Sequence, residues 1–274
     1  VPLVAKLTVL LILLTLVTVS LPFYAVANET PHREASVERV AGYSWYHWRR
    51  PGADSCILWL GGGQLTQSYV TVNPYELESL NTMRLIEDLS SRYGMLALKE
   101  GEIEYRVDSR LVSKICRWIR DVGYTYAFVV GYSTGGIALA YELTVPEQDS
   151  PEPDGAVIIS AMIDWEEMVE KHKTSRGIEL YMSARNSGSV QRSVLLMYGD
   201  MAWFWRQGEK FYKNLPNEGW RGKNWFYKDW RLMKGVEHEV FTLEVDGSYD
   251  SKPFAIAVNF LERVRASSLK NIES

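Results

Sequence analysis

Short runs of consecutive apolar residues recur along the chain. They cover residues 56–60, 95–98, 126–130, 156–160 and 193–198. Strands that are apolar at successive positions are typical of parallel sheets that are covered on both faces. We therefore predict a buried strand at each of these five positions.

Residues at helical spacing lie between the first three of these runs. One apolar stripe predicts a helix over residues 74–92, and a second predicts a helix over residues 108–122 that Asp108 caps. Strands that alternate with helices build parallel sheets through right-handed crossovers. The fold class that we predict is α/β, with a doubly wound, mostly parallel central sheet.

Weaker patterns flank this alternation. Residues 40–48 alternate aromatic with small or polar side chains, as an exposed early strand does. We expect a helix around residues 210–213, a last strand over residues 225–233, and a closing helix over residues 253–264.

The first residues resemble an export signal. Lys6 precedes an apolar and threonine run over residues 7–19, and then come Pro22 and the small-residue pattern Ala25-Val26-Ala27. This order predicts a signal peptide that is cleaved after Ala27. The alternative is an uncleaved anchor, because residues 7–27 could just span a bilayer. In either case we expect an extracellular or membrane-associated protein.

The rest of the chain divides into three parts. Residues 28–39 show no periodicity and are expected to form a tether, and residues 40–268 form one α/β domain. Residues 162–191 contain charged, amphipathic stretches that are too short for a second domain. We interpret them as a small helical cap inserted into the main domain.

The two cysteines, Cys56 and Cys116, have two possible states. Cys56 begins a predicted strand and Cys116 lies within a predicted helix. In an oxidising compartment they could form a disulfide. Two buried free thiols are the simpler interpretation.

Charge excludes one class of partner. The 274 residues carry a net charge of −4, and the basic clusters are short. A protein that neutralises phosphates needs a basic surface, so nucleic acid is not an expected partner. Oligomeric state cannot be inferred from this composition.

The most informative motif follows the apolar run at 126–130. Gly131-Tyr132-Ser133-Thr134-Gly135 is a G-x-S-x-G sequence, and the helix-forming residues 137–143 come directly after it. This order predicts a tight turn from a strand into a helix, in which the Ser133 hydroxyl projects from the sheet. The first amides of such a helix face any oxyanion that forms at the serine. Ser133 is therefore a candidate nucleophile.

A second glycine loop, Gly61-Gly62-Gly63, follows the strand at 56–60. Phosphate binding is not expected there, because the chain has no G-K-[ST] and these glycines lead into a polar loop rather than a helix. Backbone amides of Gly62 or Gly63 could instead complete an oxyanion hole. We expect no cofactor and no metal site.

In these motifs the chain resembles the α/β-hydrolase superfamily over about residues 40 to 265. The resemblance rests on the elbow at Ser133, the glycine loop, an acid after the strand at 193–198, and His238 after the last strand, in the order serine, acid, histidine. It implies that Ser133 is the nucleophile and His238 its base. It also implies that Thr134, with Gly62 or Gly63, donates amides to the oxyanion.

The resemblance is incomplete in the glycine loop and at the acid. Leu60 stands where lipase-like proteins have the histidine of H-G-G-G. The acid usually lies three residues beyond the glycine that ends the strand, where this chain has Ala202. Asp200 is the carboxylate nearest that position, and Asp164, after the preceding strand, is the alternative.

The function that we predict is hydrolysis of small carboxylic esters through an acyl-enzyme. Trp203 and Trp205 are expected to line the substrate pocket. A peptidase or a carbon–carbon bond hydrolase could use the same triad, because pocket shape selects the bond that is cleaved. A non-catalytic binding protein on the same fold is the alternative from another class, since Ala202 replaces the usual acid.

Overall fold

The computed structural model describes most of the predicted domain. The described residues are 35–63, 70–72, 86–101, 103–105, 110–145, 152–163, 183–221, 224–236, 240 and 251–269. The chain divides into two units, 1–35 and 36–274, and the second unit contains all the elements below. The expected signal segment, 1–27, lies outside the described residues. No helix within the described ranges is long and apolar enough to cross a membrane.

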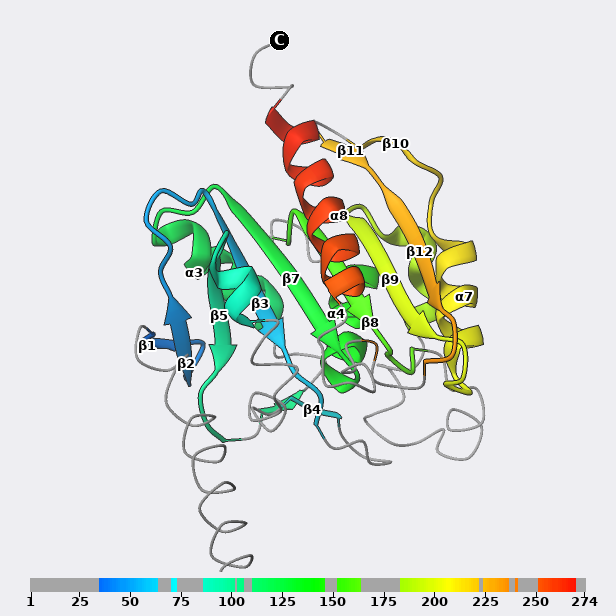
Figure 1. Ribbon diagram of the computed structural model, residues 1–274, viewed down its shortest axis with the longest axis horizontal. Coiled ribbons are helices and arrows are strands. Elements are labelled where there is room, and N and C mark those ends of the chain that lie inside the picture. Colours follow the sequence, from blue (N-terminus) through cyan, green and yellow to red (C-terminus); the bar gives the residue numbers. More distant parts are fainter. Residues whose placement is uncertain are drawn as a thin grey trace, which may run out of the picture. The chain divides into compact units, whose positions relative to one another are not determined.

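An eight-stranded sheet organises the domain (Figure 1). Its spatial order is β1-β2-β5-β3-β7-β8-β9-β12. The bounds are β1 (Ser36–Val40), β2 (Tyr43–Trp48), β3 (Ser55–Leu60), β5 (Gly94–Leu98), β7 (Tyr126–Tyr132), β8 (Gly155–Ile159), β9 (Ser193–Gly199) and β12 (Lys228–Met233). The six strands from β5 to β12 are mutually parallel, whereas β1 and β2 pair antiparallel at one edge. All five predicted buried strands are confirmed, and β7, which carries the motif, lies in the interior of the sheet.

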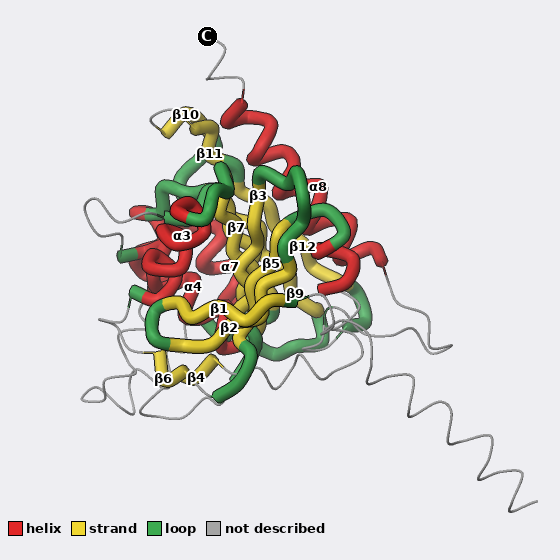
Figure 2. The backbone as a smooth tube through the Cα atoms, turned by 90° about the vertical axis from the view of Figure 1, so that its left-hand side faces the viewer, coloured by secondary structure: helices red, strands yellow, loops and turns green. Residues whose placement is uncertain are grey.

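Helices cover both faces of the sheet. The helices α3 (Leu111–Asp121), α4 (Thr134–Thr144) and α7 (Trp205–Asn214) lie on one face, and α8 (Ser251–Leu269) lies on the other (Figure 2). The fold is therefore doubly wound, as predicted. Of the expected helix at 74–92, residues 74–85 lie outside the described residues and residues 86–90 are helical. A 3₁₀ helix, η3 (Ser183–Ser189), contacts α4 and α7, while the rest of the expected cap between 164 and 182 is not described.

Four further strands are short and lie outside the main sheet. The strands β4 (Val70–Val72) and β6 (Ile103–Tyr105) form one antiparallel pair. The strands β10 (Gly219–Arg221) and β11 (Asn224–Phe226) form another.

The single early strand predicted over 40–48 is wrong. The chain forms a hairpin in which β1 pairs antiparallel with β2. Ala41 and Gly42 form its turn, with φ of 51° and 90°. Positive φ at both central residues is the geometry that matches the twist of a two-residue hairpin. The tether also ends earlier than predicted, because β1 begins at Ser36 rather than after residue 39.

The last strand predicted over 225–233 is two strands. Its first residues belong to β11, which pairs with β10, and the rest form β12, which pairs with β9. The break falls at Tyr227, whose N–H donates to Ser193 Oγ at 2.9 Å, while that hydroxyl contacts the Trp225 carbonyl oxygen at 3.2 Å. Ser193 thus satisfies the backbone where the ladder changes partner.

Asp108, the predicted cap of α3, lies outside the described residues. The helix begins at Leu111, with Arg110 at the N-cap in the left-handed conformation (φ 47°). Its first amides are satisfied by Glu142 of α4. Glu142 Oε1 accepts from Val112 N–H at 2.8 Å, and Oε2 accepts from Ser113 N–H at 3.0 Å. A carboxylate at the N-terminus of a helix also complements the helix dipole.

Cys56 and Cys116 are both buried and both free. The disulfide hypothesis is therefore wrong, and the alternative of two free thiols holds. Burial raises the pKa of each thiol well above its ordinary value. Both are consequently held as neutral thiols in the core, where they pack as small apolar side chains.

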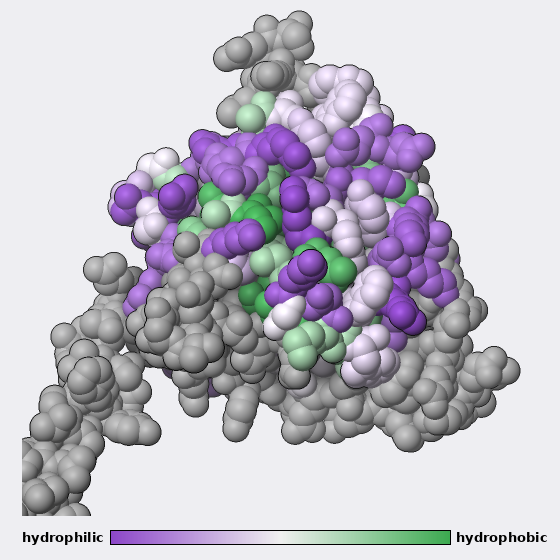
Figure 3. Space-filling model, turned by 45° about the vertical axis from the view of Figure 1, so that its right-hand side comes forward, coloured by the Kyte–Doolittle hydropathy of each residue, from purple (hydrophilic) through white to green (hydrophobic). Residues whose placement is uncertain are grey.

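Large apolar side chains that reach solvent are scattered. Among the described residues they are Val37, Val122, Met201, Trp203, Trp220 and Leu232. On the face that Figure 3 shows, apolar patches are small and lie between hydrophilic residues. Such scattered exposure is normal on a protein surface.

A buried histidine, His47, lies near the amino ends of the parallel strands, whereas the motif lies at their carboxyl ends. His47 is 1% exposed, and its Nε2 lies 3.2 Å from the hydroxyl of Tyr124. Its Nδ1 lies 3.8 Å from Glu38 Oε1. His47 and Tyr124 also line a cavity of about 280 Å³ that includes residues 49–51. Because those residues precede β3 and Tyr124 precedes β7, this cavity lies at the amino ends of the strands.

We expect His47 to make stability depend on pH. Burial, followed by the charge of Arg49, lowers the pKa of His47 below 6.5, although Glu38 opposes the shift. Below about pH 6.5 the unfolded chain therefore binds a proton at His47 more readily than the folded chain does. The free energy of unfolding is therefore highest above that pH and decreases as the pH falls. Thermal melts between pH 5 and 7.5 should show a steeper loss in the wild type than in His47→Gln. Equal slopes would contradict this assignment.

Candidate active site

Ser133 lies in a strained turn between β7 and α4. Its backbone has φ 53° and ψ −119°, which few residues other than glycine adopt. Its N–H donates to the Ile159 carbonyl at 2.9 Å, and its own carbonyl accepts from Gly136 N–H at 3.0 Å. The turn thus joins the neighbouring strand β8 on one side and starts the helix on the other. This is the tight strand-to-helix turn that the motif predicts, and the role of Ser133 as a nucleophile remains a prediction.

The glycines on either side of Ser133 are required by close approach of the backbone. A Cβ on Gly131 would lie 2.7 Å from the Gly135 carbonyl oxygen. A Cβ on Gly135 would lie 2.2 Å from the carbonyl oxygen of Leu60. Neither position has room for a side chain, because the obstructing atoms belong to the backbone. The spacing of the motif therefore has a steric cause.

The same contact brings the glycine loop to the elbow. The position of a Cβ on Gly135 is 2.6 Å from the Gly61 carbonyl oxygen, so the end of β3 passes directly against the start of α4. Gly62 and Thr134 are both buried beside this crossing. The two segments that were predicted to supply oxyanion amides are therefore adjacent. That Thr134, Gly62 and Gly63 bind an oxyanion remains a prediction.

Asp200 lies at the carboxyl end of β9 and contacts the chain that leads toward His238. Its N–H donates to the Met233 carbonyl at 3.0 Å, and its Oδ1 accepts from Gly235 N–H at 2.7 Å. The next amide, that of Met201, donates to the Val236 carbonyl at 3.0 Å. These three bonds fix the start of the histidine loop beside the carboxylate. His238 itself and the alternative acid Asp164 lie outside the described residues.

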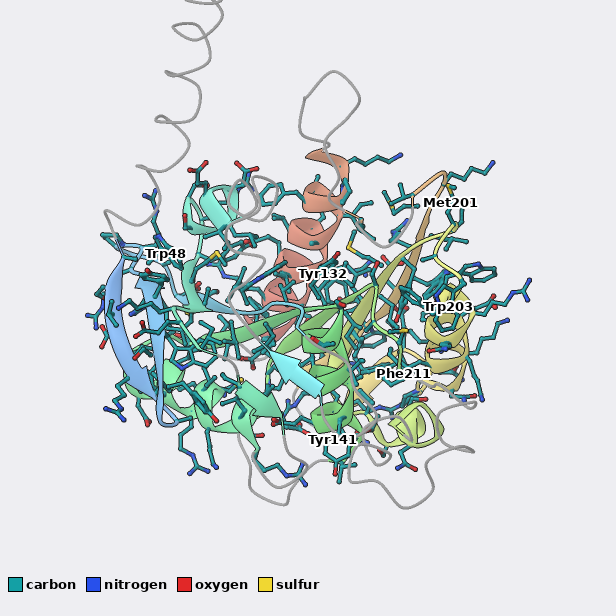
Figure 4. The ribbon with its side chains drawn as sticks, turned by 90° about the horizontal axis from the view of Figure 1, so that it is seen from below. Trp48, Tyr132, Tyr141, Met201, Trp203 and Phe211 are labelled. Atoms are coloured by element: carbon teal, nitrogen blue, oxygen red, sulfur yellow. The ribbon has the colours of Figure 1, made fainter. Side chains whose placement is uncertain are left out.

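The two tryptophans predicted to line a pocket differ in exposure. Trp203 is 63% exposed and packs edge-on against Phe204, with ring centroids 5.5 Å apart. Trp205 is partly buried against the core at the start of α7. Figure 4 views the carboxyl edge of the sheet, with Tyr132 near its middle and Met201 and Trp203 both on the side of α7. The pocket role of both tryptophans remains a prediction.

Comparison with known proteins identifies the fold. No model of a protein family matches the chain, and no curated protein does. Solved structures do match it. The esterase Pf2001 of Pyrococcus furiosus is 15% identical, with a TM-score of 0.56 over 84% of this chain and 92% of that one. An esterase/lipase from an uncultured bacterium is 18% identical, with a TM-score of 0.57 over 86% of each chain. Carboxyl esterase 2 of the mycorrhizal fungus Tuber melanosporum is 14% identical, with a TM-score of 0.56 over 88% of this chain and 89% of that one.

The chain has the α/β-hydrolase fold. Counted along the chain, the strands of its main sheet have the spatial order 1-2-4-3-5-6-7-8, and only the second strand runs antiparallel to the others. Within the α/β-hydrolase fold, Ser133 follows the fifth strand and Asp200 the seventh. Both residues therefore lie at the carboxyl edge, where ligands bind in open α/β sheets.

The motifs did not single out Ser160, a further residue of this edge. It follows β8, between the strands of Ser133 and Asp200, and its φ is 47°. In the sequence it is the polar end of an apolar run, which is how many buried strands end. Only the backbone conformation distinguishes it.

Proposed function

We propose that this protein is a serine hydrolase that cleaves carboxylic esters, with Ser133, His238 and Asp200 as its triad. The observation that carries the proposal is the strained conformation of Ser133 on a glycine-flanked elbow. Strain of this kind persists only where the surrounding structure enforces it, and it collects at active sites. The structural likeness to esterases supports ester substrates.

The chemistry would proceed in two halves. Ser133 Oγ attacks the ester carbonyl carbon while His238 takes its proton, and the oxyanion that forms is met by the amides of Thr134 and the glycine loop. The tetrahedral species collapses as His238 returns the proton to the departing alcohol, which leaves an acyl-enzyme. Water, activated by His238, then attacks the acyl carbon and releases the acid and the free serine.

Asp200 fits the third role for a geometric reason. Its Oδ1 is bonded to Gly235 N–H, which fixes the carboxylate beside the loop that carries His238. A carboxylate has a second oxygen with two further acceptor sites. That oxygen would accept the remaining imidazole N–H, fix the tautomer and stabilise the imidazolium.

The test of the function is turnover on a substrate panel. Purified protein should hydrolyse short-chain aryl esters, which release a chromophore. Peptide anilides, which a peptidase cleaves, and a diketone that a carbon–carbon bond hydrolase cleaves are assayed in parallel. They distinguish the two alternatives that use the same triad. Turnover confined to either of these substrates would replace the ester assignment. Absence of turnover on all of them would favour a binding protein.

Replacing Asp200 by asparagine is expected to lower kcat by at least about a hundredfold. Asparagine keeps the Oδ1 acceptor for Gly235 N–H, so the loop stays attached while the negative charge is lost. Asp164→Asn is the matched control and should retain activity. Steady-state kinetics on one aryl ester measure both variants. If Asp164→Asn is inactive while Asp200→Asn is fully active, Asp164 is the acid.

A further inference from the structure

Ser160 combines two unfavourable features. Among the described residues, only Ala41, Arg110, Ser133 and Ser160 have positive φ without being glycine. Ala41 lies in a hairpin turn and Arg110 caps a helix, which leaves the two serines. Ser160 is also 0% exposed, and within the described part of the chain its hydroxyl has no hydrogen-bond partner. Strain and a buried unsatisfied hydroxyl both cost stability.

The peptide group between Ile159 and Ser160 forms hydrogen bonds on both sides, to Ser133 and to β9, the strand that Asp200 follows. The carbonyl of this peptide, from Ile159, accepts from Ser133 N–H at 2.9 Å. Its N–H, from Ser160, donates to the Met197 carbonyl at 2.9 Å. The register of β7 with β8 ends with Tyr132 opposite Ile159, so Ser133 and Ser160 are the next residues of two neighbouring strands, which lie about 4.8 Å apart. A serine hydroxyl reaches across such a distance.

The turn after Ser160 is fixed from both sides. The Ala161 carbonyl accepts from the hydroxyl of the buried Tyr198 at 2.7 Å. On the other side, a Cβ on Gly136 would lie 2.7 Å from Ala161 Cβ, so the turn packs directly against the start of α4. Ser160 therefore cannot relax without moving the elbow. Glycine at 160 would relieve the strain, and alanine would remove the unsatisfied hydroxyl.

We propose that the hydroxyl of Ser160 donates a hydrogen bond to the side chain of Ser133 during turnover. The inference rests on the proposed function. Negative charge develops on Ser133 Oγ when its proton leaves and again when the acyl-enzyme breaks down. A donor that is already buried and oriented stabilises such charge without reorganisation. The hydroxyl then gains a partner that it does not have in the resting state.

Two substitutions separate the hydroxyl from the strain. Ser160→Ala removes the donor and keeps a strained residue, whereas Ser160→Gly removes both. We expect each to lower kcat for an aryl ester at least about tenfold, with KM within about twofold of the wild type. The melting temperature should be unchanged or higher for Ser160→Ala and higher for Ser160→Gly. A structural role would instead lower activity and melting temperature together.

Ser193→Ala is the matched control. Ser193 is also a buried serine, but its hydroxyl bonds to the backbone at Trp225 and Tyr227. It is the first residue of β9 and therefore lies at the amino ends of the strands, away from Ser133. We expect this variant to melt at a lower temperature and to keep kcat per folded molecule.

The outcomes separate the inference from the function on which it rests. An active wild type with Ser160→Ala at full kcat overturns the inference alone. Loss of kcat in Ser160→Gly but not in Ser160→Ala also overturns it, because backbone geometry rather than the donor would then matter. A wild type without turnover on any ester overturns both.

Discussion

Replacing Ser133 by alanine is expected to reduce hydrolysis of short-chain aryl esters by at least about a thousandfold. The substitution removes the atom that would form the acyl-enzyme, and it changes little else. Alanine at φ 53° is about as strained as serine, so the elbow and its stability should be retained. Steady-state kinetics measure the loss, and a thermal melt shows that the variant is folded.

His238→Ala should lose activity to a similar extent, because residues of a triad act as a unit. Ser90→Ala is the control. Its hydroxyl donates to the nearby Glu87 carbonyl at 3.0 Å in the helical turn at 86–90, and the activity of this variant should equal that of the wild type. Residual activity of Ser133→Ala above a tenth of the wild-type rate would remove Ser133 from the mechanism.

Replacing Glu142 by glutamine is expected to lower the free energy of unfolding by about 3 kcal/mol. Glu142 is 6% exposed, and its two oxygens accept from Val112 N–H, Ser113 N–H and Ser113 Oγ. Glutamine keeps one acceptor and turns an amide NH₂ toward groups that also donate. At least one buried donor at the start of α3 then has no acceptor, and the charge that complements the helix dipole is lost.

Chemical denaturation measures the loss, which corresponds to a fall in melting temperature of roughly 6–12 °C for a domain of this size. Glu209→Gln is the matched control. Glu209 forms an exposed pair with Lys213 one helical turn away, and such pairs contribute about 0.5 kcal/mol or less. If the two variants are equally stable, Glu142 does not cap α3.

The parallel sheet could be predicted because its signal is local. A strand that is covered on both faces is apolar throughout, and β3, β5, β7, β8 and β9 all show this in sequence. The hairpin of β1 and β2 could not be predicted, because its turn places Ala41, a residue with no turn preference, at positive φ. The alternating pattern continues through the turn and conceals it.

The cap of α3 shows the same limit at longer range. Asp108 is the residue that local rules favour, yet the carboxylate that binds the first amides comes from Glu142, thirty residues away. Only packing of α4 against α3 brings it there. Mid-helix glutamate in an apolar stretch is the one sequence feature that indicates a buried partner.

In the candidate site, too, some residues could be predicted from the sequence and one could not. The elbow around Ser133 could be predicted from its flanking glycines, because close backbone approach permits no other residue type at Gly131 and Gly135. Asp200 was predicted as the acid from its place after a strand, two residues before the usual position, and its bond to Gly235 supports that prediction. Ser160 could not be identified, since backbone strain leaves no mark on residue type when the residue is not glycine.

Covalent labelling of Ser133 tests the central claim most directly. A fluorophosphonate reacts only with a serine whose proton can be removed and whose oxyanion is stabilised. Wild-type protein should be labelled to one equivalent, peptide mass spectrometry should place the adduct on Ser133, and Ser133→Ala should remain unlabelled. An adduct on another residue, or an unlabelled wild type that is folded by its thermal melt, would contradict the account.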